Sequence, residues 1–224
     1  MKSILERWRP YLHNREYMMS AGLSLLMLVA SAIINFGAGI YAADRVSNPV
    51  TDIILSNIPV YDVDGIFIYG PLVLFAVIFW LCFSEPKQLP FICKSLALFI
   101  VIRSGFVSLT HIAPFPTRIG IQPSDIISFF TSGNDLFFSG HTGIPFLMAL
   151  IFWNNPFWRY FFIILSIFFG IIVLMGHLHY SIDVASAFFI TYSIFHIAER
   201  FFKTDLRVFF GGLSGQKENI EAKA

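Results

Sequence analysis

The chain is organised around the stretch Asp135-Leu136-Phe137-Phe138-Ser139-Gly140-His141-Thr142, a polar turn that carries an imidazole and opens an otherwise apolar segment. A second polar turn, His179-Tyr180-Ser181-Ile182-Asp183, opens another apolar segment further along. Ionisable side chains inside apolar segments are expensive and by default mark a functional site. We therefore expect these two helix starts to meet at one surface of the bundle and to form a single site.

The composition is that of a membrane protein. Of the 224 residues, 56% are hydrophobic and 13% are charged, whereas soluble domains contain roughly 25% charged residues. The formal net charge of +1 gives no reason to expect a nucleic-acid partner, which calls for a basic patch. Cys82 and Cys93 fit no metal-ligand spacing, so we expect them to be buried small apolar residues rather than a disulfide.

Hydropathy divides the chain into six apolar segments, and we predict an all-α integral membrane protein with a six-transmembrane-helix bundle. The fourth segment is short unless the Ser139-Gly140 turn already lies in the membrane interface. We expect a cytoplasmic N-terminal segment (1–17), a membrane catalytic domain (18–198) and a cytoplasmic tail (199–224). The predicted spans are 18–43, 66–83, 91–109, 141–153, 157–175 and 180–198.

Loop charges orient this bundle through the positive-inside rule. The cations of the N-terminal segment, of the short connections and of the C-terminal tail all fall on one side. The opposite side receives two long loops, 44–65 and 110–140, in which Arg45 and Arg118 are the only Lys or Arg residues. We therefore expect both termini to be cytoplasmic and the histidine-bearing turns to face outward.

Three residues carry the predicted chemistry. His179 and Asp183 are four residues apart, so they project from one helical face. The carboxylate can accept a hydrogen bond from one ring nitrogen, which leaves the other nitrogen for substrate. His141 could protonate a departing oxygen as a general acid. Phosphorus chemistry fits this set, because an imidazole can form a covalent phosphorus intermediate that a hydroxyl or water then displaces.

Other residues are candidates for holding the substrate. The helix start at Ser139 and Gly140 offers backbone N–H groups and the positive dipole end to an anion. Arg103 can pair bidentately with phosphate oxygens, and His111 and Asp135 are further pocket candidates. Because the sequence contains no dense acidic cluster to hold Mg²⁺, we expect metal-independent chemistry without a cofactor.

The structural alternative is that such histidines only bond neighbouring helices, which is the common role of a lone histidine in a span. We assign that role to His196, deep in the last predicted span, and we interpret His177 as a loop residue without a positioned partner. For His141, His179 and Asp183 together, the shared motif context favours catalysis.

These motifs resemble the type 2 phosphatidic acid phosphatase (PAP2) superfamily and, within it, the sphingomyelin synthase branch. Three stretches carry the resemblance: residues 103–116, with the run Leu109-Thr110-His111-Ile112-Ala113-Pro114-Phe115-Pro116, then residues 134–142, then residues 179–184. Together they cover about a fifth of the chain, and the six-span layout extends the likeness to most of it.

The resemblance implies a His-His-Asp site on the non-cytoplasmic leaflet. There His179 would be the nucleophile, Asp183 would orient it, and His141 would be the acid toward the leaving group. The implied reaction moves a phospho-headgroup from a phospholipid donor to a lipid alcohol, ceramide or diacylglycerol, through a phosphohistidine. The product would be a sphingomyelin or ceramide phosphoethanolamine type of lipid.

One departure from the resemblance bears on the substrate. Superfamily phosphatases carry an arginine six residues before the final histidine, and Val173 stands there. A phosphodiester donor carries less negative charge than a phosphomonoester and would need fewer cations, which fits Arg103 acting almost alone. Alternatives remain open: a lipid phosphate phosphatase or phospholipase C-like hydrolase, or a non-catalytic lipid-binding or transporting protein. The small size favours a bacterial inner membrane, with the site facing the periplasm.

Overall fold

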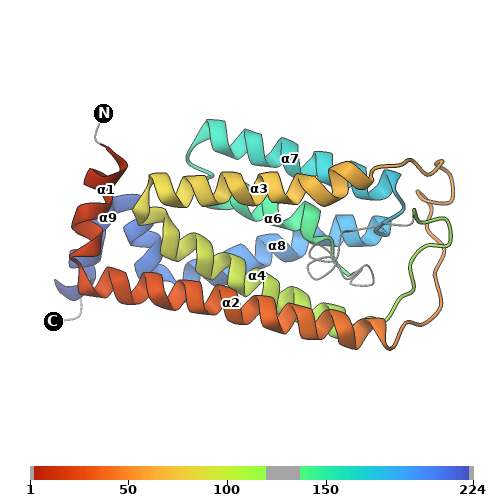
Figure 1. The fold of residues 1–224 in the computed structure, drawn as a ribbon, viewed down its shortest axis with the longest axis horizontal. Coiled ribbons are helices and arrows are strands. Elements are labelled where there is room, and N and C mark those ends of the chain that lie inside the picture. The colour runs from red at the N-terminus through yellow and green to blue at the C-terminus, as the bar shows by residue number, and fades with distance from the viewer. Residues whose placement is uncertain (1–2, 120–136, 222–224) are drawn as a thin grey trace.

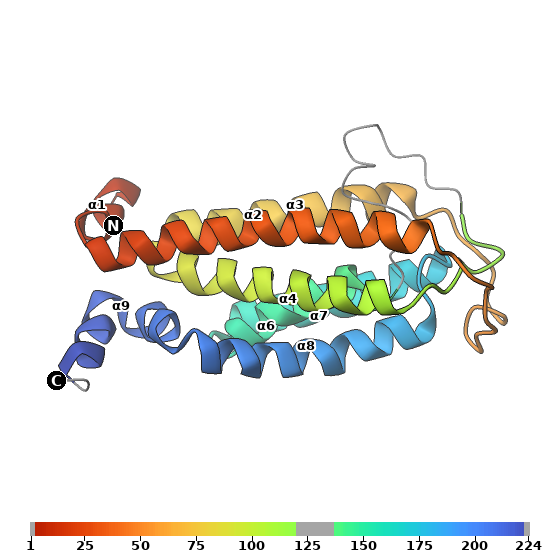
Figure 2. The same cartoon turned by 90° about the horizontal axis from the view of Figure 1, so that it is seen from below.

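A computed structural model describes residues 3–119 and 137–221 of the chain, with side chains as far as Ser214. The long helices lie along one common axis, and the short first helix and the last helix lie together at one end of the bundle (Figures 1 and 2). Within the described residues the chain contains α1 (Ile4–Leu12), α2 (Arg15–Ala43), α3 (Asp64–Ser84), the 3₁₀ turn η1 (Pro86–Gln88), α4 (Leu89–Leu109), α6 (Gly140–Ile151), α7 (Pro156–Met175), α8 (Ser181–Phe201) and α9 (Lys203–Glu221).

Five of these helices are long and apolar enough to cross a membrane, which indicates an integral membrane protein. They are α2, α3, α4 with the preceding η1, α7 and α8. The fourth predicted span corresponds to α6, which has only 12 residues and a length of about 18 Å at 1.5 Å per residue. A bilayer core is about 30 Å thick, so the sixth crossing is not confirmed. Instead, α6 begins part-way along the bundle (Figures 1 and 2).

The interior of the bundle is built around α6. Eight of its twelve residues are buried, and its neighbours are α4, α7 and α8. A helix that is apolar all round is stable only when other helices cover it. By contrast, α2 exposes large apolar side chains such as Leu26 (65%) and Ile33 (67%), as expected of a helix whose outer face meets lipid. Cys82 and Cys93 are both free and buried, as the sequence predicts.

Two glycines allow the central helices to approach one another. A Cβ atom on Gly143 of α6 would lie 2.7 Å from the Phe99 ring of α4 and 3.0 Å from Thr191 Oγ1 of α8. A Cβ atom on Gly170 of α7 would lie 3.1 Å from Val184 Cγ1 and 3.5 Å from Thr142 Oγ1. Small residues at helix contacts are how membrane bundles bring backbones close together, so these positions set how near α6 and α8 come to their neighbours.

The loop between α2 and α3 is fastened to the start of α8 by Asp52. Its Oδ2 atom accepts hydrogen bonds from the Ser181 backbone N–H at 2.7 Å and from Ser181 Oγ at 2.8 Å. Its Oδ1 atom accepts from the N–H groups of Ile54 and Leu55. Burial by itself would raise the pKa of Asp52, but these hydrogen bonds stabilise the carboxylate and lower the pKa below its ordinary value.

Tyr180 ties two loops to the same helix start. Its hydroxyl donates to the Ala113 carbonyl at 2.8 Å and lies 3.3 Å from the Val50 backbone N–H, which donates to it. The side chain is only 1% exposed. The start of α8 is therefore held by segments that are far apart in the sequence.

Candidate active site

The two polar turns of the sequence are in direct contact. The Ser139 backbone N–H donates to the carbonyl of Asp183 at 3.2 Å, which joins the start of α6 to the first turn of α8. Ser139 also caps α6, because its Oγ atom accepts from the Thr142 N–H at 3.4 Å, the role that serine commonly plays at this position. The sequence places these residues some forty positions apart, and the fold brings them together.

Asp183 contacts both the backbone and an imidazole. Its Oδ2 atom accepts the Tyr180 N–H at 2.9 Å, so the carboxylate caps the beginning of its own helix. The same oxygen lies 3.5 Å from His179 Nδ1, which is long for a hydrogen bond. Catalytic hydrogen bonds are often long without substrate and tighten when it binds. Asp183 is 1% exposed and His179 is 6% exposed, so the pair is shielded from solvent.

Arg103 of α4 lies against the backbone of the α6 turn. Its Nε–H donates to the Phe138 carbonyl at 2.9 Å, and a Cβ atom on Gly140 would lie 3.5 Å from Arg103 Nε. One Nη atom is 3.5 Å from Asn35 Oδ1 of α2. The arginine is 8% exposed, so a buried positive charge stands beside the start of α6 and close to the Asp183 contact.

His141 makes its described contacts with α3 and α7. Its Nε2 atom is 3.0 Å from the Phe67 carbonyl, and its ring stacks on the Phe67 ring with centroids 4.2 Å apart. Pro71 stands four residues after Phe67 inside α3 and has no N–H, so it cannot bond that carbonyl. The imidazole supplies the missing donor, which assigns a proton to Nε2 and fixes the position of the ring.

His177 is a residue whose position the sequence interpretation missed. It follows the end of α7 in the left-handed conformation with φ 53°, where glycine is usual. Its N–H bonds the Leu174 carbonyl and the next N–H, of Leu178, bonds Val173, which together form a Schellman motif. The side chain is 3% exposed, and its Nδ1 atom is 2.5 Å from Thr117 Oγ1.

Far from lacking a positioned partner, His177 is therefore held by its backbone conformation and by a hydroxyl. The signal in the sequence was weak, because only its position directly after Gly176 at a helix end pointed to it. Its Nε2 atom is buried and makes no hydrogen bond to the described part of the chain.

The remaining two predicted pocket residues are not joined to this cluster by described contacts. His111 lies beside Tyr41 of α2, with ring centroids 5.6 Å apart, and its carbonyl accepts from the N–H and Oγ of Ser47. Asp135 lies outside the described residues. Among residues 3–119 and 137–221, no three His, Cys, Asp or Glu side chains are grouped as ligands of a metal ion would be.

The fold and the site define a class: an all-helical integral membrane protein whose interior holds a buried histidine–aspartate pair, a second histidine and an arginine around two helix starts. Residues 132–200 match the family described as PAP2 superfamily C-terminal, which supports membership of the PAP2 superfamily. The match includes both polar turns and covers less than half of the chain. No curated protein and no solved structure gives a significant match.

The superfamily match indicates the class of activity. Members of the PAP2 superfamily are phosphatases and phosphotransferases, so lipid phosphatase or phosphotransferase activity is the general function that the match suggests for this chain. The match does not distinguish between branches of the superfamily.

Proposed function

We propose that the protein is a phospholipid headgroup phosphotransferase of the sphingomyelin synthase type. His179 is the nucleophile, Asp183 orients it, and His141 is the general acid and base. The donor is a phospholipid, the acceptor is a lipid alcohol such as ceramide or diacylglycerol, and the active site faces the non-cytoplasmic leaflet. No metal or cofactor takes part.

The observation that carries this proposal is the contact of Asp183 with three groups at once. Its carboxylate lies 3.5 Å from His179 Nδ1 and accepts the Tyr180 N–H, while its carbonyl accepts the N–H of Ser139. A carboxylate near Nδ1 favours the tautomer with the proton on that nitrogen, so Nε2 presents the lone pair. One residue, Asp183, therefore contacts both the proposed nucleophile and the start of α6.

The first step breaks the bond between phosphorus and the oxygen of the donor's lipid alcohol. His179 Nε2 attacks phosphorus and forms a P–N bond, while His141, as the imidazolium, gives its proton to the departing oxygen. Because the Phe67 carbonyl accepts the Nε2–H of His141, the additional proton of the charged ring is carried on Nδ1. Phosphorus is then bound to His179 as a phosphohistidine that keeps its ester bond to the headgroup alcohol, and the lipid alcohol leaves with its acyl chains intact.

The second step reverses these roles. The hydroxyl of the acceptor lipid attacks phosphorus, His141 accepts its proton, and the P–N bond to His179 breaks. If water takes the place of the acceptor hydroxyl, the same sequence of steps gives hydrolysis. Transferase and hydrolase activity therefore differ only in whether a lipid hydroxyl or water attacks the intermediate.

Stabilisation of the phosphoryl oxygens falls to Arg103 and to the start of α6. The guanidinium carries a fixed positive charge and already lies against the turn through the Phe138 carbonyl and Gly140. The first turn of α6 adds the positive end of its dipole. In many enzymes, electrostatic stabilisation by such preorganised donors is the largest single contribution to the rate enhancement.

The experiment that tests the proposal follows a phospholipid labelled in its headgroup phosphate, with purified protein in lipid nanodiscs. Reactions run with and without ceramide or diacylglycerol, and the lipid and water-soluble products are separated. The His179→Ala variant is compared with His196→Ala. His196 is a matched control because it lies on α8, which begins two residues after His179, and it bonds only Glu199 among polar groups in the described residues.

The expected result is a new labelled phospholipid that requires the added lipid alcohol, lost in His179→Ala and kept in His196→Ala. Release of labelled headgroup phosphate into water without any new lipid would show that the protein is a hydrolase and not a transferase. Equal turnover by wild type and His179→Ala would refute the catalytic assignment, and no lipid turnover by any folded variant would favour a non-catalytic protein.

A further inference from the structure

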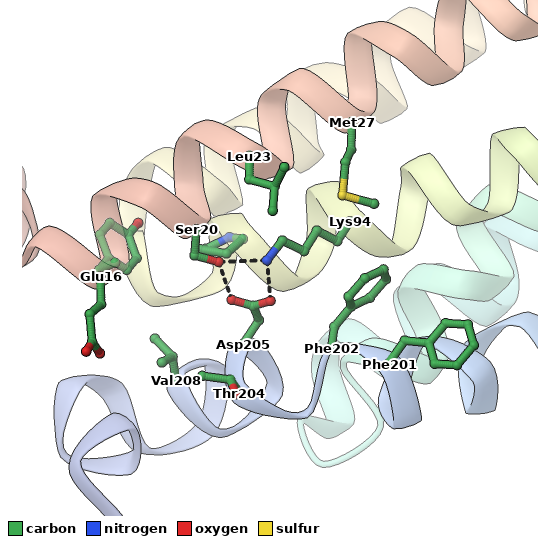
Figure 3. A pocket seen from close by; sticks show the side chains of 12 residues that line it. Glu16, Ser20, Leu23, Met27, Lys94, Phe201, Phe202, Thr204, Asp205 and Val208 are labelled. Atoms are coloured by element: carbon green, nitrogen blue, oxygen red, sulfur yellow. Dashed lines mark hydrogen bonds and ion pairs between the residues drawn. The ribbon is translucent and has the colours of Figure 1, made fainter. Parts of the chain in front are cut away.

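A cavity of about 410 Å³ is lined by residues of α2, α4, α8 and α9 (Figure 3). The junction of α8 with α9 lies at the end of the bundle that carries α1, far from the start of α8 (Figure 1). The cavity walls come from α2, the beginning of α4, and the junction of α8 with α9. Apolar side chains such as Leu23, Met27 and Phe202 cover much of the wall, and Ser20, Lys94 and Asp205 form a polar group inside it. A volume of several hundred cubic ångströms is in the range of small-molecule sites.

The polar group is a closed ring of three hydrogen bonds, drawn in Figure 3. Lys94 Nζ donates to Asp205 Oδ2 at 2.6 Å and to Ser20 Oγ at 2.7 Å, and Ser20 Oγ donates to Asp205 Oδ1 at 2.5 Å. The side chains of Lys94 and Asp205 are each 8% exposed. The ring joins α2, α4 and α9, which are distant in the sequence.

Stability alone is a weak explanation for a buried ion pair of this kind. Removing two charges from water costs several kcal/mol per ion, and well-packed apolar residues often stabilise as well or better. Ionisable residues at membrane depth mark functional positions by default. Here the pair faces a cavity rather than a close-packed interface, which is where a ligand could use it.

The hydrogen bonds of the ring determine what it can offer to a ligand. Both oxygens of Asp205 already accept bonds, one from Ser20 and one from Lys94. The ammonium has three N–H donors, and two of them are used within the ring. Within the described residues the third N–H of Lys94 has no hydrogen-bond acceptor, and the ammonium lies 5.8 Å from the centroid of the Phe202 ring. That donor suits an acceptor oxygen such as that of a hydroxyl or an ester.

The charges of the wall select against ionised ligands. Lys94 is paired with Asp205, so the polar group inside the cavity carries no net charge of its own. An anionic phosphate would have to approach the Asp205 carboxylate and would find no unpaired cation in the group to balance its charge. A cationic amine would have to approach the Lys94 ammonium and would be repelled by it. An uncharged oxygen-bearing group avoids both penalties.

The mouth of the cavity opens toward the apolar outer surface of the bundle. Leu23 of α2 and Phe201 of α8 line the cavity, yet they are 50% and 71% exposed. These side chains lie on helices long enough to span a membrane, so the surface around them is one that lipid covers. A ligand can therefore keep its acyl chains in the bilayer while its polar end reaches Lys94.

We propose that this cavity binds the hydroxyl-bearing end of an uncharged lipid alcohol, with diacylglycerol as the probe of that class. The site is separate from the histidine site and lies at the opposite end of the bundle, so it takes up lipid from the other leaflet. The proposal does not rest on the proposed reaction, and its test requires no turnover.

The test is photo-crosslinking with a diacylglycerol that carries a diazirine on one acyl chain, using the full chain in nanodiscs. Crosslinked peptides are mapped by mass spectrometry, and unlabelled diacylglycerol, phosphatidic acid and a long-chain amine compete separately. Met27→Trp fills the cavity with a larger side chain. Leu26→Trp is the matched control, because Leu26 is the adjacent residue, is 65% exposed and does not line the cavity.

The expected result is labelling of the peptides around Ser20 to Met27 or around Phe202 to Asp205, lowered about tenfold by Met27→Trp and by unlabelled diacylglycerol. Leu26→Trp, phosphatidic acid and the amine should leave it nearly unchanged. Should Met27→Trp not fold, Leu23→Trp blocks the mouth instead. Labelling that neither substitution reduces, or that the amine or phosphatidic acid displaces as well as diacylglycerol does, would overturn the proposal.

Discussion

Asp183 combines a structural and a chemical contact in one carboxylate. Its Oδ2 atom accepts the Tyr180 N–H at 2.9 Å and lies 3.5 Å from His179 Nδ1. The first contact caps α8 and needs only an acceptor oxygen, whereas the second depends on negative charge when the imidazole becomes positive. The two contacts can therefore be separated by substitution.

Asp183→Asn should keep the cap and lose the charge. We expect a folded protein with lipid turnover lowered by about 10²–10⁴-fold, because the imidazolium loses its stabilising partner. Asp183→Ala removes the cap as well and should lower the free energy of unfolding by about 1–2 kcal/mol. Thermal unfolding in detergent and turnover assays measure the two effects. Near wild-type turnover in Asp183→Asn would argue against the His179–Asp183 dyad.

Pro71 controls the proton on His141 through a carbonyl. Because Pro71 has no N–H, the Phe67 carbonyl accepts from His141 Nε2 at 3.0 Å. In Pro71→Ala the new N–H competes for that carbonyl. We expect nitrogen NMR of the His141 ring to change from one tautomer with Nε2 protonated to a mixture, and turnover to fall by about tenfold.

Pro90→Ala is the control for that substitution, since Pro90 stands in the first turn of α4, where a helix has no use for the N–H. It should change neither the tautomer nor the turnover. A His141 ring that keeps one tautomer in Pro71→Ala would show that the carbonyl does not fix it.

Among the helices, α6 depends most on close packing. It is too short to cross a bilayer core, it is buried on most of its surface, and it starts part-way along the bundle (Figure 2). Its place is therefore determined by its contacts with α4, α7 and α8 rather than by the membrane. The position of the Ser139 turn at the site follows from those contacts.

Gly143→Ala should displace α6. The added methyl would lie 2.7 Å from the buried Phe99 ring, and overpacking of this kind costs about 1–3 kcal/mol. Gly105→Ala on α4 meets no heavy atom within 4 Å and should stabilise its helix by about 0.5–1 kcal/mol. Unfolding temperatures in detergent compare the two. An unchanged or higher unfolding temperature in Gly143→Ala would show that α6 and its neighbours accommodate the added methyl group without loss of stability.

The contribution of Asp52, which links the α2–α3 loop to α8, to the stability of the protein should depend on pH. Because hydrogen bonds hold the pKa of Asp52 below its ordinary value, the carboxylate contributes stability that is fully present above the unfolded pKa of about 3.9. That contribution is lost as the pH falls through the folded pKa. We expect the difference in unfolding temperature between wild type and Asp52→Asn to be constant near neutral pH and to shrink below about pH 4. A difference that does not vary with pH would exclude this role for the charge.

At the scale of the whole molecule, the bundle has two chemically different ends. One end carries α1, α9 and the Lys94–Asp205 pair, and the other carries the loop anchored by Asp52 and the start of α8 (Figure 1). The excess of cations at the first end predicts that it faces the cytoplasm.

Cysteine labelling of intact cells tests that orientation. The native Cys82 and Cys93 are buried, so background labelling of these two cysteines should be small. Asn57→Cys, in the exposed part of the α2–α3 loop, should react with a membrane-impermeant maleimide. His13→Cys, exposed beside α1, should react only after the membrane is permeabilised. The reverse pattern would put the histidine site on the cytoplasmic side.

The sequence alone determined the features that depend on neighbouring residues. Composition and hydropathy predicted an all-helical membrane protein. The spacing of His179 and Asp183 predicted that both project from one helical face, which is wrong, because α8 begins at Ser181 and His179 precedes it. The two side chains nevertheless approach to 3.5 Å, since Asp183 lies in the first turn of α8 and reaches back to His179. The helix start at Ser139 was also predicted, since capping involves only three or four successive residues. Local hydrogen bonds and local hydropathy are encoded within a few residues, which is why these features could be recognised.

Only the tertiary structure decided how those pieces come together. Three features join segments that are distant in sequence: the bond between His141 and the Phe67 carbonyl, the position of Arg103 against Phe138, and the ring of Ser20, Lys94 and Asp205. No local pattern specifies such contacts, because they depend on which helix faces pack together and on the small residues that let the backbones approach.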